Sequence, residues 1–241
     1  MTLGNTGLQG WIKYHAIPFI VRTGYGDFAG AEHLLQNNYN LYGIKEIITD
    51  NNIIYKATPE ALLTVPQSIR EYDYSDLRKT DIVLDIGACV GGFSLNVAKY
   101  CRHVFAVEPI FYDQLAENIQ CNNIKNITVI KGALGKKRRG MQQISFKGST
   151  NNSIVYTLKD LITLCGGSVQ FLKCDIEGDE KFIELGDLLG IRRIEMEVHE
   201  IQEEWAKNFR AWLNKNYENI RIDPDGNNMA LIHAGTIPNE A

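Results

Sequence analysis

The stretch FLKCDIEGDE, residues 171–180, begins with the apolar residues of a buried β-strand and continues into four carboxylates within six positions. A group of acids directly after a strand is typical of three kinds of site: a metal site, an acid/base pair and the floor of a cofactor crevice. The choice among them depends on which strands lie beside this one. The four acids are Asp175, Glu177, Asp179 and Glu180.

The chain from about residue 81 onward alternates short apolar runs with amphipathic segments. This alternation is what a parallel sheet covered by helices on both faces requires. We expect five strands in this part of the chain, at residues 81–87, 103–109, 127–134, 169–176 and 191–199. Helices are expected between them, at residues 92–100, around 111–119 and, as a short helix, at about 179–188.

The segment after the fifth strand predicts an amphipathic helix and then a β-hairpin. Trp205, Phe209 and Trp212 lie at helical spacing. Two further apolar runs, residues 218–222 and 228–234, flank the turn sequence DPDGN, whose proline and glycine favour chain reversal. The expected fold is therefore α/β, with a mostly parallel twisted sheet, helices on both faces and a C-terminal antiparallel hairpin.

Residues 1–79 follow a different pattern, with short strands expected in PFIVRTG, EIIT and IIYKA and a helix in PEALLTVPQSIREY. They predict a small N-terminal α+β appendage that packs against the main sheet and is a candidate lid over an acceptor. Residues 80–241 form the predicted main domain. Five aromatic residues of the appendage either stack on a sugar ring or form its own small core: Trp11, Tyr14, Tyr25, Phe28 and Tyr39.

Length and composition set the class of protein. A chain of 241 residues fits one large domain, or one domain with an appendage. The net charge of -4 argues against a general polyanion binder. Five cysteines without C-x-x-C spacing indicate reduced thiols and a cytoplasmic location. The sequence shows neither a signal peptide nor an apolar run of roughly 18 residues, so we expect neither secretion nor membrane insertion.

The first strand ends in the glycine turn DIGACVGG, residues 85–92. In open parallel sheets this turn gives the closest backbone approach to a ligand. Its glycines, at Gly87, Gly91 and Gly92, do not match the G-x-G-x-x-G fingerprint, so a pyrophosphate is disfavoured. S-adenosylmethionine, which has no phosphate, needs backbone clearance and an acid at the next strand end for its ribose hydroxyls. Glu108 lies at that place.

A glycine turn alone can be a simple tight connection. Here, however, acids stand at three strand ends: Asp85 before the turn, Glu108 followed by Pro109 after the second strand, and the acids after the fourth. Tight turns that bind nothing have no reason to gather carboxylates in this way, because such side chains are usually placed in solvent. The pattern therefore favours a cofactor crevice.

Five stretches together resemble the FkbM-type S-adenosylmethionine-dependent methyltransferases: IVLDIGACVGGFSLNVAKY, VFAVEPIFYDQLAENIQCNN, TLKDLI, FLKCDIEGDE and EMEVHE. The likeness covers roughly residues 80–200. The combination of Glu-Pro, Thr-Leu-x-Asp-Leu and Lys-x-Asp-x-Glu-Gly is its most specific part. The resemblance implies a Rossmann-like methyltransferase fold and methyl transfer from S-adenosyl-L-methionine, most often to an oxygen of a sugar, a lipid-linked glycan or a polyketide hydroxyl.

The resemblance also implies roles for single residues. By position, the glycine turn contacts the methionine half of the cofactor, Glu108 the ribose, and Ala133 or its neighbours the adenine edge. Cys89 departs from the glycine or asparagine that is common at its position, but cysteine is small enough not to block the turn. The expected cofactor-binding residues are Asp85, Gly87, Ala88, Cys89, Gly91, Glu108, Pro109, Ala133 and Asp175.

A base that accepts the proton of an acceptor hydroxyl accelerates such a reaction by about a hundred to ten thousand fold. Strand alternation puts Asp175 and Glu177 on one face, and it gives Glu195, Glu197 and His199 a common face on the neighbouring strand. Asp175 is the candidate on the cofactor and acceptor side, and His199 or Glu177 is the candidate general base. A structural histidine at the sheet end is the alternative for His199. Asp179 and Glu180 suit the first turn of a helix, where acids complement its dipole.

Two further features have open interpretations. The basic run KKRRG, residues 136–140, is either a solvated loop or a docking site for an anionic acceptor. The carboxylates after the fourth strand suit magnesium or calcium by chemistry, but no zinc or EF-hand spacing is present, so we expect no metal site.

The leading functional prediction is an O-methyltransferase that acts on a small molecule or glycan. An RNA methyltransferase is second, because VFAVEP followed by LAENIQCNN is similar to enzymes that methylate tRNA guanine; the Asn-Pro-Pro-Tyr tetrad of base-amine methylators is absent. A non-catalytic nucleotide-binding module and an NAD-dependent oxidoreductase are the remaining alternatives. The oligomeric state cannot be read from the sequence.

Overall fold

The structure is a computed structural model that describes residues 19–23, 26–29, 44–49, 51–62, 64–146, 148–224 and 228–236. Among the aromatic residues of the expected appendage, Trp11, Tyr14, Tyr25 and Tyr39 lie outside these ranges, and so does the side chain of Phe28. Their role therefore stays a prediction.

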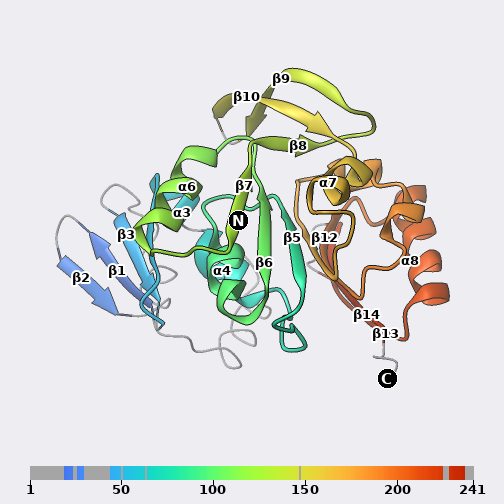
Figure 1. The fold of residues 1–241 in the computed structure, drawn as a ribbon, viewed down its shortest axis with the longest axis horizontal. Helices are drawn as coiled ribbons and strands as arrows, with labels where there is room; N and C mark the ends of the chain where they lie inside the picture. Colours follow the sequence, from blue (N-terminus) through green and yellow to red (C-terminus); the bar gives the residue numbers. More distant parts are fainter. Residues whose placement is uncertain are drawn as a thin grey trace.

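Seven strands form the central sheet: β5 (Ile82–Ile86), β6 (His103–Val107), β7 (Ile127–Ile130), β11 (Phe171–Cys174), β12 (Arg193–His199), β13 (Asn219–Pro224) and β14 (Met229–Gly235). Their order is β13-β14-β12-β11-β5-β6-β7 (Figure 1). The pairs from β12 to β7 are parallel, and β14 runs antiparallel to both β12 and β13. The expected Rossmann-like α/β fold with a C-terminal antiparallel hairpin is confirmed.

The strand order reverses between β5 and β11. The chain leaves β5 toward β6 on one side and reaches β11 later on the other side. Because the strands are parallel, β5, β6 and β11 present their carboxyl ends at one edge of the sheet. Ligands of open α/β sheets bind at such a reversal point.

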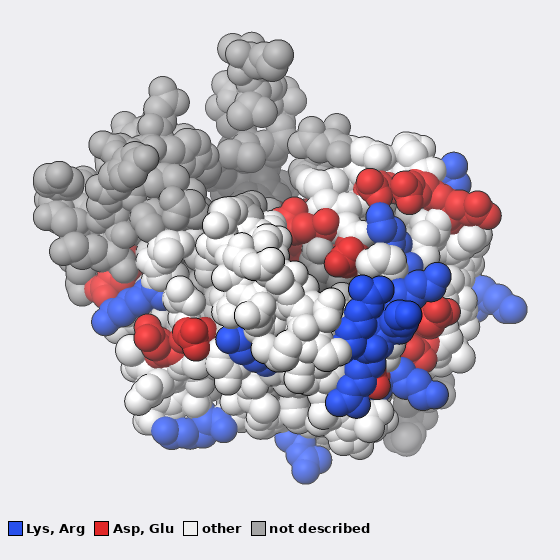
Figure 2. Space-filling view, turned by 90° about the horizontal axis from the view of Figure 1, so that it is seen from above, with Lys and Arg blue, Asp and Glu red and all other residues white. Residues whose placement is uncertain are grey.

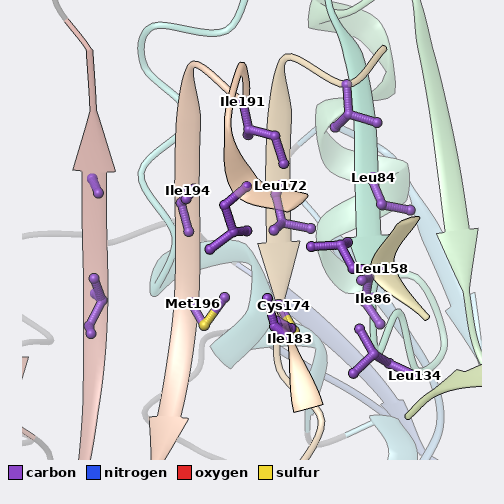
Figure 3. Close-up of a cluster of buried hydrophobic side chains, with 14 of the residues drawn as sticks. Leu84, Ile86, Leu134, Leu158, Leu172, Cys174, Ile183, Ile191, Ile194 and Met196 are labelled. Atoms are coloured by element: carbon purple, nitrogen blue, oxygen red, sulfur yellow. The ribbon is translucent and has the colours of Figure 1, made fainter. Parts of the chain in front are cut away.

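Helices cover both faces of the sheet: α5 (Gly92–Val97), η1 (Ala98–Tyr100), α6 (Tyr112–Cys121), α7 (Leu158–Leu164), η2 (Asp179–Phe182), η3 (Leu185–Leu188) and α8 (Glu204–Asn216). Helices α7 and α8 pack on the face that carries Leu84 and Leu172, while α5 and α6 contribute to the clusters on the other face. Figure 3 shows how Leu84, Leu172 and Ile194 of three neighbouring strands enter one cluster. The short helix expected at residues 179–188 is instead a pair of 3-10 helices.

The single strand expected at residues 127–134 is wrong. The chain leaves the main sheet after β7, and β8 (Gly132–Leu134) pairs with a separate hairpin formed by β9 (Arg139–Phe146) and β10 (Ser149–Tyr156). Gly132 allows this departure, because a Cβ at that position would lie 2.7 Å from the ring of Tyr156. The hairpin of β9 and β10, called the β9–β10 arm below, lies above the carboxyl edge of the main sheet (Figure 1).

The N-terminal segment forms an antiparallel sheet of order β2-β1-β3-β4 followed by two short helices. Its side chains share a core with the glycine turn and the helices after it: Tyr55, Leu62 and Val65 cluster with Val90 and Leu115. The segment is therefore packed onto the main sheet, as expected, and the domain boundary at residue 80 stays a prediction. The elements are β1 (Phe19–Thr23), β2 (Gly26–Ala29), β3 (Ile44–Thr49), β4 (Ile54–Lys56), α3 (Pro59–Leu62) and α4 (Thr64–Arg70).

Two asparagines of α6 pair with the free edge of β4. Asn118 Oδ1 accepts the N–H of Lys56 and Asn122 Oδ1 accepts the N–H of Ile54, both at 2.8 Å. The amide of Asn118 also donates to the carbonyl of Val90 in the glycine turn at 3.0 Å. Backbone groups of an edge strand need such partners when they are buried. Asn118 thus ties the N-terminal sheet to the turn.

Within the described residues, no helix combines the length and the apolar character that a membrane crossing requires. All five cysteines carry free thiols.

We expect Asn118→Leu to lower the free energy of unfolding by about 2 to 4 kcal/mol, because it leaves the Lys56 N–H and the Val90 carbonyl without partners. Chemical denaturation measures this loss. Gln120→Leu, an equivalent change at an exposed position of α6, is the control and should stay within about 0.5 kcal/mol of the unmodified protein. Equal stability of the two variants would contradict the role of Asn118.

Candidate active site

The glycine turn joins β5 to α5 and passes close to β11. Gly87 has a φ of +79°, and a Cβ there would lie 1.8 Å from the backbone carbonyl oxygen of Asp175. Only glycine fits this combination of backbone conformation and close approach. Cys89 has a φ of +49° and Gly91 a φ of +96°, so the turn contains three left-handed residues. Such a strained backbone conformation persists only when contacts with neighbouring residues stabilise it.

Lys173 of β11 provides some of these contacts, although its side chain is buried and only 1% exposed. Its ammonium donates to the carbonyl of Gly87 at 2.8 Å and lies 3.3 Å from Asp85 Oδ1 and 3.9 Å from Asp175 Oδ2. Burial lowers the pKa of Lys173, but the two carboxylates outweigh burial and hold this pKa above its ordinary value. Ser94 donates to the other oxygen of Asp85 at 2.6 Å. Both oxygens of Asp85 therefore have partners inside the protein, Oδ2 in a hydrogen bond and Oδ1 in an ion pair.

Glu108, at the end of β6, is buried and stabilises the turn from the side opposite Lys173 through hydrogen bonds to backbone N–H groups. Its Oε2 accepts the N–H of Cys89 at 2.8 Å, and its Oε1 accepts the N–H groups of Ile110 and Phe111 at 2.6 and 2.9 Å. Burial raises the pKa of Glu108, and these three hydrogen bonds oppose that rise. A carboxylate has about four acceptor positions, so the contacts leave about one position open, on Oε2.

A cavity opens beside Cys89. Phe111 follows β6 on one side of it, Thr64 of α4 lies on another, and Phe146 and Ser149 of the β9–β10 arm complete the lining together with Thr58 and Ala61. Thr64 Oγ1 donates to Cys89 Sγ at 3.4 Å. Burial raises the pKa of the Cys89 thiol to about 12, so this cysteine is a neutral lining group.

A pair of carboxyl groups lies on the opposite flank of the turn. Asp175 follows β11, and Glu197 of the neighbouring β12 is hydrogen-bonded to it. Burial, together with the charge of Asp175, raises the pKa of Glu197 to about 8. Glu197 therefore keeps its proton at neutral pH, which avoids two like charges in contact. Tyr72 also donates to Asp175 Oδ2, at 3.1 Å.

His199 is surrounded by carboxylates. Its Nε2 lies 3.6 Å from Glu177 and 3.9 Å from Glu197, and its Nδ1 lies 3.3 Å from Glu180. Hydrogen bonds to Glu177 and then to Glu180 raise the pKa of His199 to about 10. The imidazole is therefore positively charged at neutral pH. Glu180, which is 1% exposed, also accepts the N–H groups of Ile176 and Gly178, so it stabilises the loop after β11.

The structure gathers the sequence-predicted residues into two adjoining groups. Asp85, Gly87 and Asp175 meet through Lys173, whereas Ala88, Cys89 and Gly91 lie in the turn beside Glu108 and Pro109. Glu177 and His199 lie next to Asp175 on the outer side, but β11 ends at Cys174 and Glu177 has a φ of +58°, so strand alternation does not reach Glu177.

Two of the residues singled out from the sequence lie elsewhere. Ala133 belongs to β8 and is paired with Val155 of the arm. Glu195, expected on one face with Glu197, is fully buried, forms an ion pair with Arg193 and is hydrogen-bonded to His233. Glu195 therefore stabilises the fold and does not face the candidate site.

Sequence reasoning missed three residues that complete the site: Lys173, Tyr72 and Ser94. Lys173 could have been found, because alternation places it on the same face as Asp175 in FLKCDIEGDE. Nothing in the local pattern around Tyr72 or Ser94 indicates that either one reaches a carboxylate of another element. Among the described residues, no cluster of three or more His, Cys, Asp and Glu side chains could hold a metal ion.

No family model matches the chain. A stretch of 59 residues, 24% of this chain and 32% of the relative, is 36% identical to a probable cobalt-precorrin-6B C(15)-methyltransferase (decarboxylating) from Methanocaldococcus jannaschii. A stretch of 111 residues, 45% of this chain and 22% of the relative, is 29% identical to an uncharacterized RNA methyltransferase from Streptococcus agalactiae. The matches thus span about a third or less of these curated relatives.

Among solved structures, TYW2 from M. jannaschii in complex with AdoMet aligns with 80% of this chain and 87% of its own, at a TM-score of 0.49 and 16% identity.

We expect Lys173→Met to destabilise the protein by about 3 to 5 kcal/mol, because it leaves the buried charge of Asp85 uncompensated. The measurement is urea unfolding at neutral pH. Lys181→Met, which breaks the exposed ion pair with Glu200, is the control and should cost less than about 1 kcal/mol. The double variant Asp85→Asn/Lys173→Met should regain part of the loss. A Lys173→Met protein as stable as the Lys181→Met control would contradict this account.

Proposed function

We propose that this chain is an S-adenosyl-L-methionine-dependent methyltransferase that methylates a hydroxyl group of a sugar, a glycan or another small molecule. The observation that carries the proposal is the buried Glu108 carboxylate at the carboxyl end of β6, which keeps about one acceptor position open beside the glycine turn. One ribose hydroxyl fits that position. The two curated relatives, both named as methyltransferases, support the same reaction class.

The residues around the glycine turn, called the cofactor crevice below, have different proposed roles in binding the cofactor. When bound, S-adenosylmethionine supplies a methyl group that is already activated for transfer. Glu108 accepts a ribose hydroxyl, and Gly87 and Cys89 line the methionine half with backbone atoms. Asp85 acts through Lys173, because its carboxylate is fully buried and does not reach the crevice.

The remaining residues predicted to bind the cofactor keep supporting roles in this proposal. Ala88 and Gly91 shape the turn, in which the N–H of Gly91 donates to the carbonyl of Ala88 at 2.8 Å. Pro109 and Ala133 are the proposed neighbours of the adenine; the carbonyl of Pro109 accepts a hydrogen bond from Ser153 of the arm, and Ala133 is paired with Val155 of the same arm. Asp175 borders both the methionine half and the acceptor.

The pair of Asp175 and Glu197 is the proposed proton acceptor. A hydroxyl that attacks a methyl carbon loses its proton, and Glu197, once it has released its own proton, can take this one up. His199 and Glu177, the two bases considered from the sequence, form an ion pair with each other instead. We propose that they position the loop after β11 and keep Glu197 in place, since a histidine that is already charged cannot accept a proton.

Membership of the FkbM-type group is a further part of the proposal. It is supported by the Lys-x-Asp-x-Glu-Gly motif, whose lysine and aspartate both contact the crevice here. The free thiols support a reducing, cytoplasmic compartment. RNA methylation is the second candidate, because one of the curated relatives is named an RNA methyltransferase.

Calorimetry tests the cofactor. S-adenosylmethionine and S-adenosylhomocysteine should bind, and NAD should not. Glu108→Gln should weaken S-adenosylhomocysteine about tenfold or more, because it removes a charged acceptor and places an amide against the Cys89 N–H. Glu117→Gln, an exposed change on α6, should leave binding unchanged. Binding of NAD without a response to either adenosyl ligand would overturn the proposal.

The pH dependence of methyl transfer tests the base. The assay measures the transfer of a labelled methyl group from S-adenosylmethionine into fractions of a cell extract. Glu197 accepts a proton only after it has lost its own, so the rate of transfer should rise with pH and level off above about 8. Glu197→Gln should remove this rise and slow transfer about a hundredfold or more, while S-adenosylhomocysteine still binds. Glu200→Gln, an exposed change, should preserve the profile. A pH rise that persists in Glu197→Gln would exclude the pair.

A further inference from the structure

The β9–β10 arm begins with a run of four basic residues that the site described above does not use. Lys136, Lys137, Arg138 and Arg139 are consecutive, and all four are exposed. Lys136–Arg138 precede β9 and Arg139 is its first residue, so the run lies at the root of the arm. In the view from above, several Lys and Arg side chains form one band beside groups of Asp and Glu, and other Lys and Arg side chains are scattered around it (Figure 2).

Few carboxylates lie close to the charges of this run; Arg138 is near Asp160 and, after hydrogen bonds from Thr157, helps to lower the pKa of that carboxyl. Among the described residues, no salt bridge involves Lys136, Lys137 or Arg139, whereas Lys181, Arg192 and Arg221 each pair with an acid. Arg138 packs over the ring of Tyr156, 5.6 Å from its centroid, which holds its guanidinium at the root of the arm. Four like charges side by side repel one another, and a bound anion relieves that repulsion.

The arm is fixed to the cofactor crevice at several points. Ser153 Oγ donates to the carbonyl of Pro109 at 2.9 Å, and Asn151 donates to the carbonyl of Ile110 at 3.3 Å. Phe146 and Ser149, near the other end of the arm, line the cavity beside Cys89. A ligand held by the basic run is therefore held by the same element that walls the crevice.

We propose that the basic run at the root of the β9–β10 arm binds a phosphate or diphosphate group of a small-molecule acceptor, such as a sugar phosphate, and orients its hydroxyl toward Asp175 and Glu197. This inference rests on the proposed methyl transfer and narrows its substrate class. The anionic end of the acceptor meets the arm, and its neutral hydroxyl end meets the acids at the ends of β11 and β12. The two ends of the site thus carry opposite charges.

The surroundings of the run favour a small phosphate ligand over a polynucleotide. A polynucleotide is held by many phosphate contacts along an extended basic track, commonly about six to ten. The run offers four residues, and the same edge of the protein carries exposed acids, Glu177, Asp179 and Glu200. The net charge of -4 adds a repulsive background for a long polyanion.

The test uses inorganic pyrophosphate as the probe, measured by calorimetry on the full chain with S-adenosylhomocysteine present. The variant carries Lys136→Gln, Lys137→Gln, Arg138→Gln and Arg139→Gln. The control carries Lys99→Gln, Arg102→Gln, Lys125→Gln and Lys215→Gln, the same change of charge at exposed positions outside the arm. Thermal unfolding verifies that both variants are folded.

We expect pyrophosphate to bind the unmodified protein and the control, and to bind the arm variant about tenfold or more weakly. Affinity should fall as salt is added. Failure of pyrophosphate to bind the unmodified protein, or equal binding to the arm variant, overturns the proposal. A single-stranded RNA that binds more tightly than pyrophosphate and loses binding in the arm variant also overturns it, in favour of RNA. Binding of S-adenosylhomocysteine alone, measured on the same samples, reports separately on the proposed function.

Discussion

The buried ion pairs of Lys173 are the constraint on which the crevice depends. A lysine this deeply buried is stable only with carboxylates close to it, and here Asp85 and Asp175 supply them from two neighbouring strands. The same ammonium holds the carbonyl of Gly87, so it fixes a turn with three left-handed residues. The close approach of Gly87 to Asp175 follows from this arrangement and explains why the turn begins with glycine.

Around this centre the carboxyl edge of the sheet is divided by charge. Glu108 accepts hydrogen bonds from three backbone amides, which leaves about one acceptor position open. On the other side of Lys173, Glu197 has a raised pKa beside Asp175, and the charged His199 lies 3.9 Å from Glu197. The β9–β10 arm brings four exposed basic residues, Lys136 to Arg139, to the same edge. In the proposed reaction, this edge holds the cofactor, the proton acceptor and the anionic end of the acceptor.

Much of this architecture could be predicted from the sequence, because strand and helix periodicities differ and carboxylates after strands are uncommon. The apolar runs around Leu84, Leu172 and Ile194 predicted the central strands. The β9–β10 arm was missed because it is largely exposed and polar, so no apolar alternation marks it. Tyr72 was missed because its contact with Asp175 joins residues 103 positions apart. Register across strands, which brings Lys173 opposite Asp85, is set by the folded sheet and not by local sequence.

The most direct test of the central claim is a crystal structure of the chain with S-adenosylhomocysteine. The account predicts the nucleoside at the carboxyl ends of β5 and β6, with a ribose hydroxyl donating to Glu108 Oε2 and the sulfur directed toward Asp175. A nucleoside bound away from the glycine turn, or one whose ribose makes no contact with Glu108, would contradict it.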